Sequence, residues 1–283
     1  MNAIEWLRII IIGVIEGITE WLPISSTGHM ILLESIWPST AKEIMSPEFW
    51  SVFLVVIQLG AVLAVATLFF HRLNPLSPQK TPSQKQETWR LWGKVLIGCL
   101  PAAIAGLLLD DWMDEHLYNS GVVAAMLILY GLVFVLLEYI RKGKKPTIRK
   151  SEDLSYRVAL LIGLIQILSL VPGTSRSGVT IIGAMLIGCS RYLAAEFTFF
   201  LAIPVMLGAG GLKLLKYIMD GQDLSGTQIA VMAMGMIVAY VVSLFCVRFL
   251  MNYVKKRDFR PFGYYRIALG IVVLLYFWAA NFS

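Results

Sequence analysis

Long apolar runs dominate this chain, and short polar or charged segments separate them. A transmembrane helix needs about 20 mostly apolar residues. Runs of suitable length predict six membrane-spanning helices, at about 50–70, 92–109, 122–140, 197–217, 229–250 and 264–280. The pattern therefore predicts an all-α polytopic membrane protein, folded as a single integral membrane domain over residues 1–283.

Four further apolar pieces are shorter or carry polar residues. They cover about 4–22, 26–37, 156–171 and 177–189, and a Pro/Gly break separates the two members of each pair. Irregular backbone at membrane depth is tolerated only where protein surrounds it or where it lines a cavity. We therefore expect four re-entrant half-helices, arranged as two hairpins.

The two hairpins resemble each other in sequence, which indicates an internal repeat. At an offset of 150 residues, Gly13, Glu16, Ser25, Ser26, Thr27 and Gly28 align with Gly163, Gln166, Ser175, Arg176, Ser177 and Gly178. Three predicted spans, an odd number, separate the copies, so the second copy is expected to be inverted. Inverted repeats with broken helices place a binding site near the membrane midplane. We predict repeat halves of approximately 1–140 and 150–283, with the two breaks facing each other.

The distribution of charge predicts the orientation in the membrane. Basic residues gather at 71–94, 141–157 and 248–266, whereas acidic residues mark 110–120 and 218–228. The positive-inside rule places the three basic loops in the cytoplasm. Six spans fit only if each hairpin enters and leaves on one side, so both termini are expected outside. The first segment carries Glu16 and Glu20 and lacks a basic start, so we expect it to be retained and not cleaved as a signal peptide.

Composition supports the membrane assignment and excludes other classes. Hydrophobic residues make up 58% of the chain and charged residues 15%, against about 25% charged residues in soluble domains. Although the formal net charge is +6, the basic residues flank hydrophobic spans, so no nucleic-acid partner is expected. Cys99, Cys189 and Cys246 lie far apart in apolar segments and are expected to be buried small hydrophobes.

The first polar motif begins with two acids inside an apolar helix. Glu16 and Glu20 are one helical turn apart and share a face. Two such carboxylates suit a divalent cation, Mg²⁺ or Ca²⁺, that also binds phosphate oxygens. Alternatively, one carboxylate activates a neighbouring nucleophile, or the acids only pair with Arg176. Because ionisable residues at membrane depth are costly, a functional role is favoured.

The motif continues with a helix break and a new helix start. Pro23 is expected to end the first helix. The start of the next carries small and hydroxyl residues: Ser25, Ser26, Thr27 and Gly28. Hydroxyls and free N–H groups at a helix start bind anions, so we expect a phosphate group here. His29 follows in the first turn. Ser26 and His29 are both candidate nucleophiles, and His29 is also a candidate general acid.

The second motif supplies a positive charge. Arg176 is expected to be the one cation at this depth, and its planar guanidinium matches phosphate oxygens. Further substrate-binding groups are predicted around it: Gly173, Ser175, Ser177, Gly178 and Thr180. The alternative is an ion pair between Arg176 and Glu16 or Glu20 that only stabilises the fold. Since Gln166 replaces Glu16 in the second copy, the site is asymmetric, which favours catalysis.

These motifs resemble those of the undecaprenyl-diphosphate phosphatases, the bacitracin-resistance family of bacterial cell membranes, over nearly the whole chain. The matching strings are acid-x-x-x-Glu at Glu16 and Glu20, Pro-x-Ser-Ser-Thr-Gly-His at 23–29, Pro-Gly-x-Ser-Arg-Ser-Gly-x-Thr at 172–180, and Ser-Arg-Tyr-x-Ala-Ala-Glu-Phe at 190–197. The resemblance implies hydrolysis of a C55 polyprenyl diphosphate, a divalent-metal requirement, and a site open to the outer face of the bacterial cytoplasmic membrane. It implies an active-site set of Glu16, Glu20, Ser26, His29, Ser175, Arg176 and Thr180.

A transporter or flippase for a lipid phosphate or a phosphorylated solute is the alternative function, because secondary transporters also use inverted repeats and broken helices. The grouping of Glu, Ser, His and Arg favours an enzyme, since transport needs no nucleophile. Membrane lipids are expected neighbours. The small residues at 208–211 suit a homodimer interface or intramolecular packing equally well.

Overall fold

The structure, a computed structural model, describes residues 2–280, apart from the side chains of Asp110, Asp111 and Asp114. Its helices are α1 (Ala3–Thr19), α2 (Ser26–Ile36), α3 (Pro47–Leu68), α4 (Phe70–Leu73), α5 (Pro82–Leu117), α6 (Ser120–Ile140), α7 (Tyr156–Gln166) with the 3-10 turn η1 (Ile167–Leu170), α8 (Arg176–Ile187), α9 (Arg191–Met219), α10 (Gly226–Tyr253) and α11 (Arg260–Ala280). Among the described residues, the only β-type backbone pairing is an isolated bridge between Ile148 and Cys189. The all-α prediction is confirmed.

Six helices are long and apolar enough to cross a membrane, and they are the six that hydropathy predicts: α3, α5, α6, α9, α10 and α11. The chain is therefore a multi-pass membrane protein. The four shorter apolar pieces form α1, α2, α7 with η1, and α8. Their re-entrant course across a lipid bilayer stays a prediction.

Several helix ends differ from the predicted ones. α5 begins at Pro82, not near 92, because Thr81 and Gln84 form a capping box and Pro82 takes the first helical position. The same helix continues to Leu117, so most of the acidic segment predicted as a loop is helical. α9 starts at Arg191, where the Ser190 side chain accepts a hydrogen bond from the backbone N–H of Leu193.

The sequence analysis counted Arg266 among the basic residues of the third loop, at 248–266, and the structure places it elsewhere. α11 begins at Arg260, which places Arg266 inside the membrane-spanning helix and not in the loop. Its side chain is fully buried. Consequently Arg176 is not the one cation at the depth of the helix breaks.

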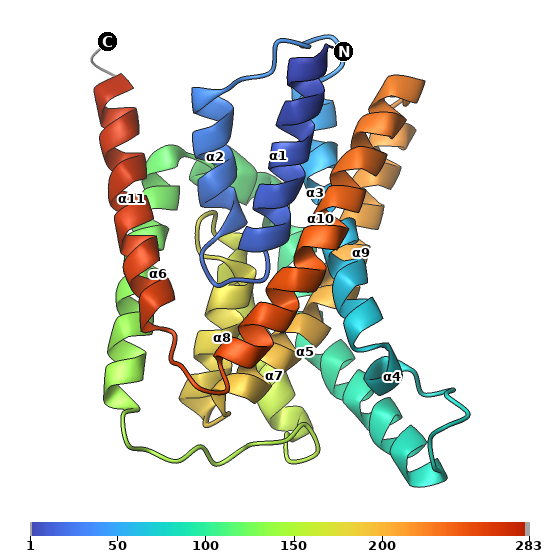
Figure 1. The fold of residues 1–283 in the computed structure, drawn as a ribbon, viewed down its shortest axis with the longest axis vertical. Helices are drawn as coiled ribbons and strands as arrows, with labels where there is room; N and C mark the ends of the chain where they lie inside the picture. Colours follow the sequence, from blue (N-terminus) through green and yellow to red (C-terminus); the bar gives the residue numbers. More distant parts are fainter. Residues whose placement is uncertain (1, 281–283) are drawn as a thin grey trace.

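The two hairpins approach each other from opposite ends of the molecule (Figure 1). α1 and α2 descend from the top of the view, α7 and α8 rise from the bottom, and the two breaks lie at middle height. The start of α1 and the end of α11 lie at the top, while the connections α4–α5, α6–α7 and α10–α11 lie at the bottom.

Glycines let the hairpin helices pack closely on their neighbours. A Cβ atom on Gly13 would lie 2.9 Å from Val238 Cβ, and one on Gly17 would lie 2.8 Å from the Ala239 carbonyl oxygen, both on α10. A Cβ atom on Gly163 would overlap the backbone of Gly98 on α5. The aligned Gly13 and Gly163 therefore serve close helix packing in their respective hairpins.

Candidate active site between the two helix breaks

The two breaks share one unusual backbone conformation. Ser25 has φ 72° and ψ 105°, and Ser175 has φ 71° and ψ 114°. They are the only non-glycine residues with positive φ among those described. Such conformations cost about 1–3 kcal/mol and persist only where the surrounding structure enforces them, often at functional sites. The aligned serines therefore form matching turns, each directly before a helix.

The hydroxyl groups of these serines have different environments. Ser175 Oγ accepts a hydrogen bond of 3.2 Å from the backbone N–H of Gly178 and so caps α8. Ser25 makes no such cap, and its buried Oγ has no hydrogen-bond partner. The start of α2 therefore presents an unpaired hydroxyl and backbone N–H groups without a side-chain cap, an arrangement that suits an anion.

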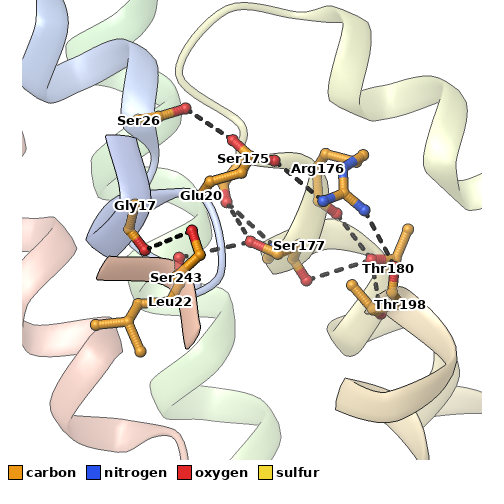
Figure 2. A network of polar contacts seen from close by, with 11 residues as sticks. Gly17, Glu20, Leu22, Ser26, Ser175, Arg176, Ser177, Thr180, Thr198 and Ser243 are labelled. Atoms are coloured by element: carbon orange, nitrogen blue, oxygen red, sulfur yellow. Dashed lines mark hydrogen bonds and ion pairs between the residues drawn. The ribbon is translucent and has the colours of Figure 1, made fainter. Parts of the chain in front are cut away.

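An ion pair joins the two breaks. Arg176 Nη2 donates to Glu20 Oε1 at 3.0 Å, and the Ser26 hydroxyl donates to Glu20 Oε2 at 3.1 Å (Figure 2). The Glu20 side chain is 8% exposed and that of Arg176 is 10% exposed. Three of the predicted site residues thus meet in a largely buried cluster.

The remaining contacts of Arg176 fix its orientation. Nη1 donates to the carbonyl oxygen of Thr198 at 3.1 Å, and the guanidinium carbon lies 5.9 Å from the centre of the Trp21 ring. Nε is buried without a partner. The Thr180 hydroxyl is fully buried, donates to the Arg176 carbonyl oxygen at 2.8 Å and accepts from the Thr198 hydroxyl at 2.8 Å. Thr180 therefore supports the helix turn that carries Arg176.

The other predicted substrate-binding residues lie against protein neighbours. The Ser177 hydroxyl reaches the Leu22 carbonyl oxygen at 3.5 Å, which links the second break to the first. Cβ atoms built on the three glycines would meet protein: 2.9 Å to Leu127 for Gly28, 2.6 Å to Val123 for Gly173, and 3.2 Å to Arg266 for Gly178. Thr27 is half-buried. Ligand contact by Thr27 and these glycines stays a prediction.

His29 lies next to this cluster and hydrogen-bonds to other partners. Its Nδ1 is 2.7 Å from the Ser25 carbonyl oxygen, and its Nε2 is 2.7 Å from the Tyr265 hydroxyl. The two rings stack with centres 5.7 Å apart. Because a carbonyl oxygen only accepts, Nδ1 carries the proton, and neutral Nε2 accepts from Tyr265. The basic nitrogen of His29 therefore already accepts a hydrogen bond from the Tyr265 hydroxyl.

Arg266 connects both breaks to α6. Its Nη1 donates to the Pro23 carbonyl oxygen at 3.3 Å, and its Nη2 donates to those of Gly173 and Thr174, each at 2.9 Å, and of Met126 at 3.3 Å. Carbonyl oxygens released where helices break need such donors. The sequence analysis missed Arg266 and Tyr265, although both lie at the polar edge of the last apolar run.

Glu16 provides the second carboxylate of the site. It is fully buried one helical turn before Glu20, the two carboxyl groups interact, and Glu16 Oε1 has no hydrogen-bond partner. No group of three or more His, Cys, Asp or Glu side chains gathers in the described part of the chain. Because Mg²⁺ is often held by one or two carboxylates together with substrate phosphates, the pair fits a metal shared with the substrate.

Comparison with known proteins gives one consistent family. The model of the bacitracin resistance protein BacA family matches residues 9–272. Proteins named undecaprenyl-diphosphatase are similar over nearly the whole chain. The one from Lactiplantibacillus plantarum is 52% identical over 274 residues, covering 97% of this chain and 98% of the relative. The one from Enterococcus faecalis is 51% identical over 269 residues, covering 95% and 96%.

Proposed function

Because the chain belongs to the bacitracin resistance protein BacA family, we propose that it is a membrane-embedded undecaprenyl-diphosphate phosphatase. It hydrolyses the lipid diphosphate to undecaprenyl phosphate and inorganic phosphate, which recycles the lipid carrier for cell-wall synthesis and confers bacitracin resistance. The structural observation that carries the proposal is the contact of Glu20 with both Ser26 and Arg176 between the two breaks.

The diphosphate binds where the breaks face each other. Charge stabilisation is the main demand of phosphoryl transfer. Arg176 supplies the positive charge through its guanidinium, whose Nε is free of protein partners. The unpaired Ser25 hydroxyl and the backbone N–H groups at the start of α2 add hydrogen-bond donors. The prenyl tail leaves sideways between helices into the lipid.

Ser26 is the favoured nucleophile. Its hydroxyl already donates to the Glu20 carboxylate, the pairing expected of a nucleophile with its base. Its oxygen attacks the terminal phosphorus, the bond to the bridging oxygen breaks, and undecaprenyl phosphate leaves. Water then releases phosphate from Ser26. Both ring nitrogens of His29 are engaged, Nδ1 with the Ser25 carbonyl oxygen and Nε2 with the Tyr265 hydroxyl, so His29 serves better as a positioning group beside the phosphate than as the nucleophile.

A divalent cation, Mg²⁺ or Ca²⁺, fits the pair of acids. Glu16 and Glu20 would hold it, and the unpaired Glu16 Oε1 is a buried ligand atom without another partner. When bound, the cation neutralises negative charge on the diphosphate oxygens. Arg176 and Ser25 contribute donors from the protein itself.

The orientation that we propose places the catalytic site toward the outer side of the bacterial cytoplasmic membrane. The three basic connections share one end of the molecule, and the start of α1 and end of α11 share the other. The positive-inside rule then assigns the basic end to the cytoplasm and both termini to the outside. The matching turns at Ser25 and Ser175 support the inverted repeat. A homodimer remains a prediction.

Phosphate release from undecaprenyl diphosphate by the purified full-length protein in detergent tests this function. A phosphatase releases inorganic phosphate without a sealed membrane. A transporter or flippase, the alternative, binds the lipid and releases none. The relatives' names favour the hydrolase. Absence of phosphate release from folded, metal-supplied protein would reject the proposed activity.

A further inference from the structure

A polar cavity lies at the basic end of the molecule, lined by residues other than those of the site between the breaks. It has a volume of about 610 Å³ and is formed by α4, the start of α5, the 149–152 segment and the start of α9. Six basic side chains line it: Arg72, Lys80, Arg90, Lys94, Arg149 and Lys150. Glu87, Glu152 and Glu196 are its acidic residues. Six positive charges against three negative charges leave an excess of three.

The inner part of the cavity is fixed by buried polar contacts. Arg72 Nη1 pairs with Glu196 Oε1 at 2.6 Å, and its Nη2 donates to Ser151 Oγ at 2.9 Å. The ammonium group of Lys94 is buried and donates to the carbonyl oxygens of Ser151 at 2.8 Å and Glu152 at 3.3 Å. These bonds hold segments that are distant in sequence in a defined arrangement, so the cavity has an ordered floor.

Positively charged side chains also line the exposed rim of the cavity. Arg90 and Lys150 are exposed, and no hydrogen bond or ion pair of their side chains is found among the described residues. Lys80 donates to the Arg72 carbonyl oxygen at 3.0 Å, and burial together with the positive charge of Arg72 lowers the Lys80 pKa. Repulsion among these cations is relieved when an anion enters between them.

Membrane topology alone does not account for this arrangement. The positive-inside rule requires basic residues in the loops, but not that they converge on one cavity. Its volume lies within the range of about 300–1,000 Å³ typical of small-molecule sites. Phe70 and Trp89, each adjacent in sequence to a lining residue, and Leu76, between Arg72 and Lys80, are exposed. Exposed aromatic and apolar side chains beside basic ones are typical of the membrane interface.

We propose that this cavity binds a phosphate-bearing anion, supplied either by the head group of an anionic phospholipid or as free inorganic phosphate. Arg90 and Lys150 contact the anion at the rim, and Lys80 contacts it from the side. The ligand does not take part in the reaction between the breaks, so this site is independent of the proposed hydrolysis.

The test compares two charge-neutralising variants of the full-length protein. Arg90→Gln/Lys150→Gln removes two rim charges, and Lys144→Gln/Lys145→Gln removes two exposed charges of the same face that do not line the cavity. Native mass spectrometry measures binding of phosphatidylglycerol against zwitterionic phosphatidylcholine. Calorimetry measures binding of sodium phosphate against sodium chloride at equal ionic strength. Turnover and gel filtration check that both variants are folded.

For a lipid ligand, we expect the rim variant to bind phosphatidylglycerol about tenfold more weakly than wild type, and the control to bind like wild type. If the ligand is free phosphate, we expect the rim variant to bind phosphate about tenfold more weakly than wild type and the control variant to bind it like wild type. All three proteins should then bind phosphatidylglycerol equally. A phosphate signal common to all three proteins belongs to the catalytic site. The proposal is overturned if the rim variant binds both ligands like wild type, or if rim and control variants lose binding equally.

Discussion

Arg176 donates a hydrogen bond of 3.0 Å to Glu20, although 156 residues separate them in the sequence. One residue comes from each helix break, so this ion pair exists only when both hairpins are in place. Glu20 also accepts from Ser26. Glu20 therefore contacts the proposed nucleophile Ser26 and, through Arg176, the other half of the protein. We expect its position beside Ser26 to depend on the packing of both hairpins.

Loss of either charge of this pair should nearly abolish turnover. We expect Arg176→Ala and Glu20→Ala each to lower kcat by at least about 100-fold, because charge stabilisation at the phosphoryl group is lost. Phosphate release in detergent measures the effect. Arg260→Gln is the matched control, because it removes the more exposed ion pair with Asp258 at the start of α11, and it should retain most activity. Near-normal turnover of either site variant would contradict the assignment.

Ser26 and His29 should differ in their effect on the chemical step. We expect Ser26→Ala to lower kcat by about 1,000-fold or more, because the nucleophile is lost. His29→Gln should lower kcat less, since the His29 Nε2 is engaged by Tyr265. Rapid-quench experiments with a labelled terminal phosphate distinguish the two. Label found on His29 and not on Ser26 would reverse the roles.

Removal of Arg266 should destabilise the protein more than removal of an exposed arginine in a neighbouring helix. Arg266→Met removes the donor of four hydrogen bonds to carbonyl oxygens, three of them buried, and each buried group left unpaired costs about 1–3 kcal/mol. We expect a clear decrease in the melting temperature measured by intrinsic fluorescence. Arg248→Met, at an exposed position of α10, should have little effect. Equal melting of the two variants would show that Arg266 does not stabilise the breaks.

Removal of divalent metal should stop the reaction. We expect EDTA to eliminate phosphate release and added Mg²⁺ or Ca²⁺ to restore it. Glu16→Gln should raise the metal concentration needed for half-maximal activity by about tenfold, since one charged oxygen ligand is lost. The exposed Glu34 of α2 gives the control variant Glu34→Gln, which should keep the wild-type requirement. Full activity in EDTA would exclude the metal.

Labelling of single introduced cysteines tests the orientation. In a background lacking Cys99, Cys189 and Cys246, we expect Asp223→Cys to react with a membrane-impermeant maleimide in intact cells. Lys144→Cys, at the basic end, should react only after permeabilisation. The expected pattern follows from the positive-inside rule. The opposite pattern would invert the proposed orientation and place both termini in the cytoplasm.

Local sequence patterns determined the membrane spans and the helix breaks. Span length depends on a continuous apolar run, and each break depends on Pro, Gly and hydroxyl residues that are neighbours in the chain. Charge asymmetry of the loops also follows from local composition. The prediction that Glu20, Ser26 and Arg176 share one site followed from the internal repeat, the two helix breaks and the odd number of spans between the copies.

The tertiary structure alone decided which groups support that site. Arg266 lies at the edge of a basic loop in sequence, but its partners Pro23 and Gly173 are 243 and 93 residues away. The contact of Tyr265 with His29 spans 236 residues. A positively charged or aromatic residue at a helix end can have many local partners. The packing of α11 on α6 and α2 brings Arg266 to both breaks and Tyr265 to His29. Hydropathy describes one segment of the chain at a time. Each of these hydrogen bonds joins two segments that are distant in sequence, so hydropathy cannot predict them.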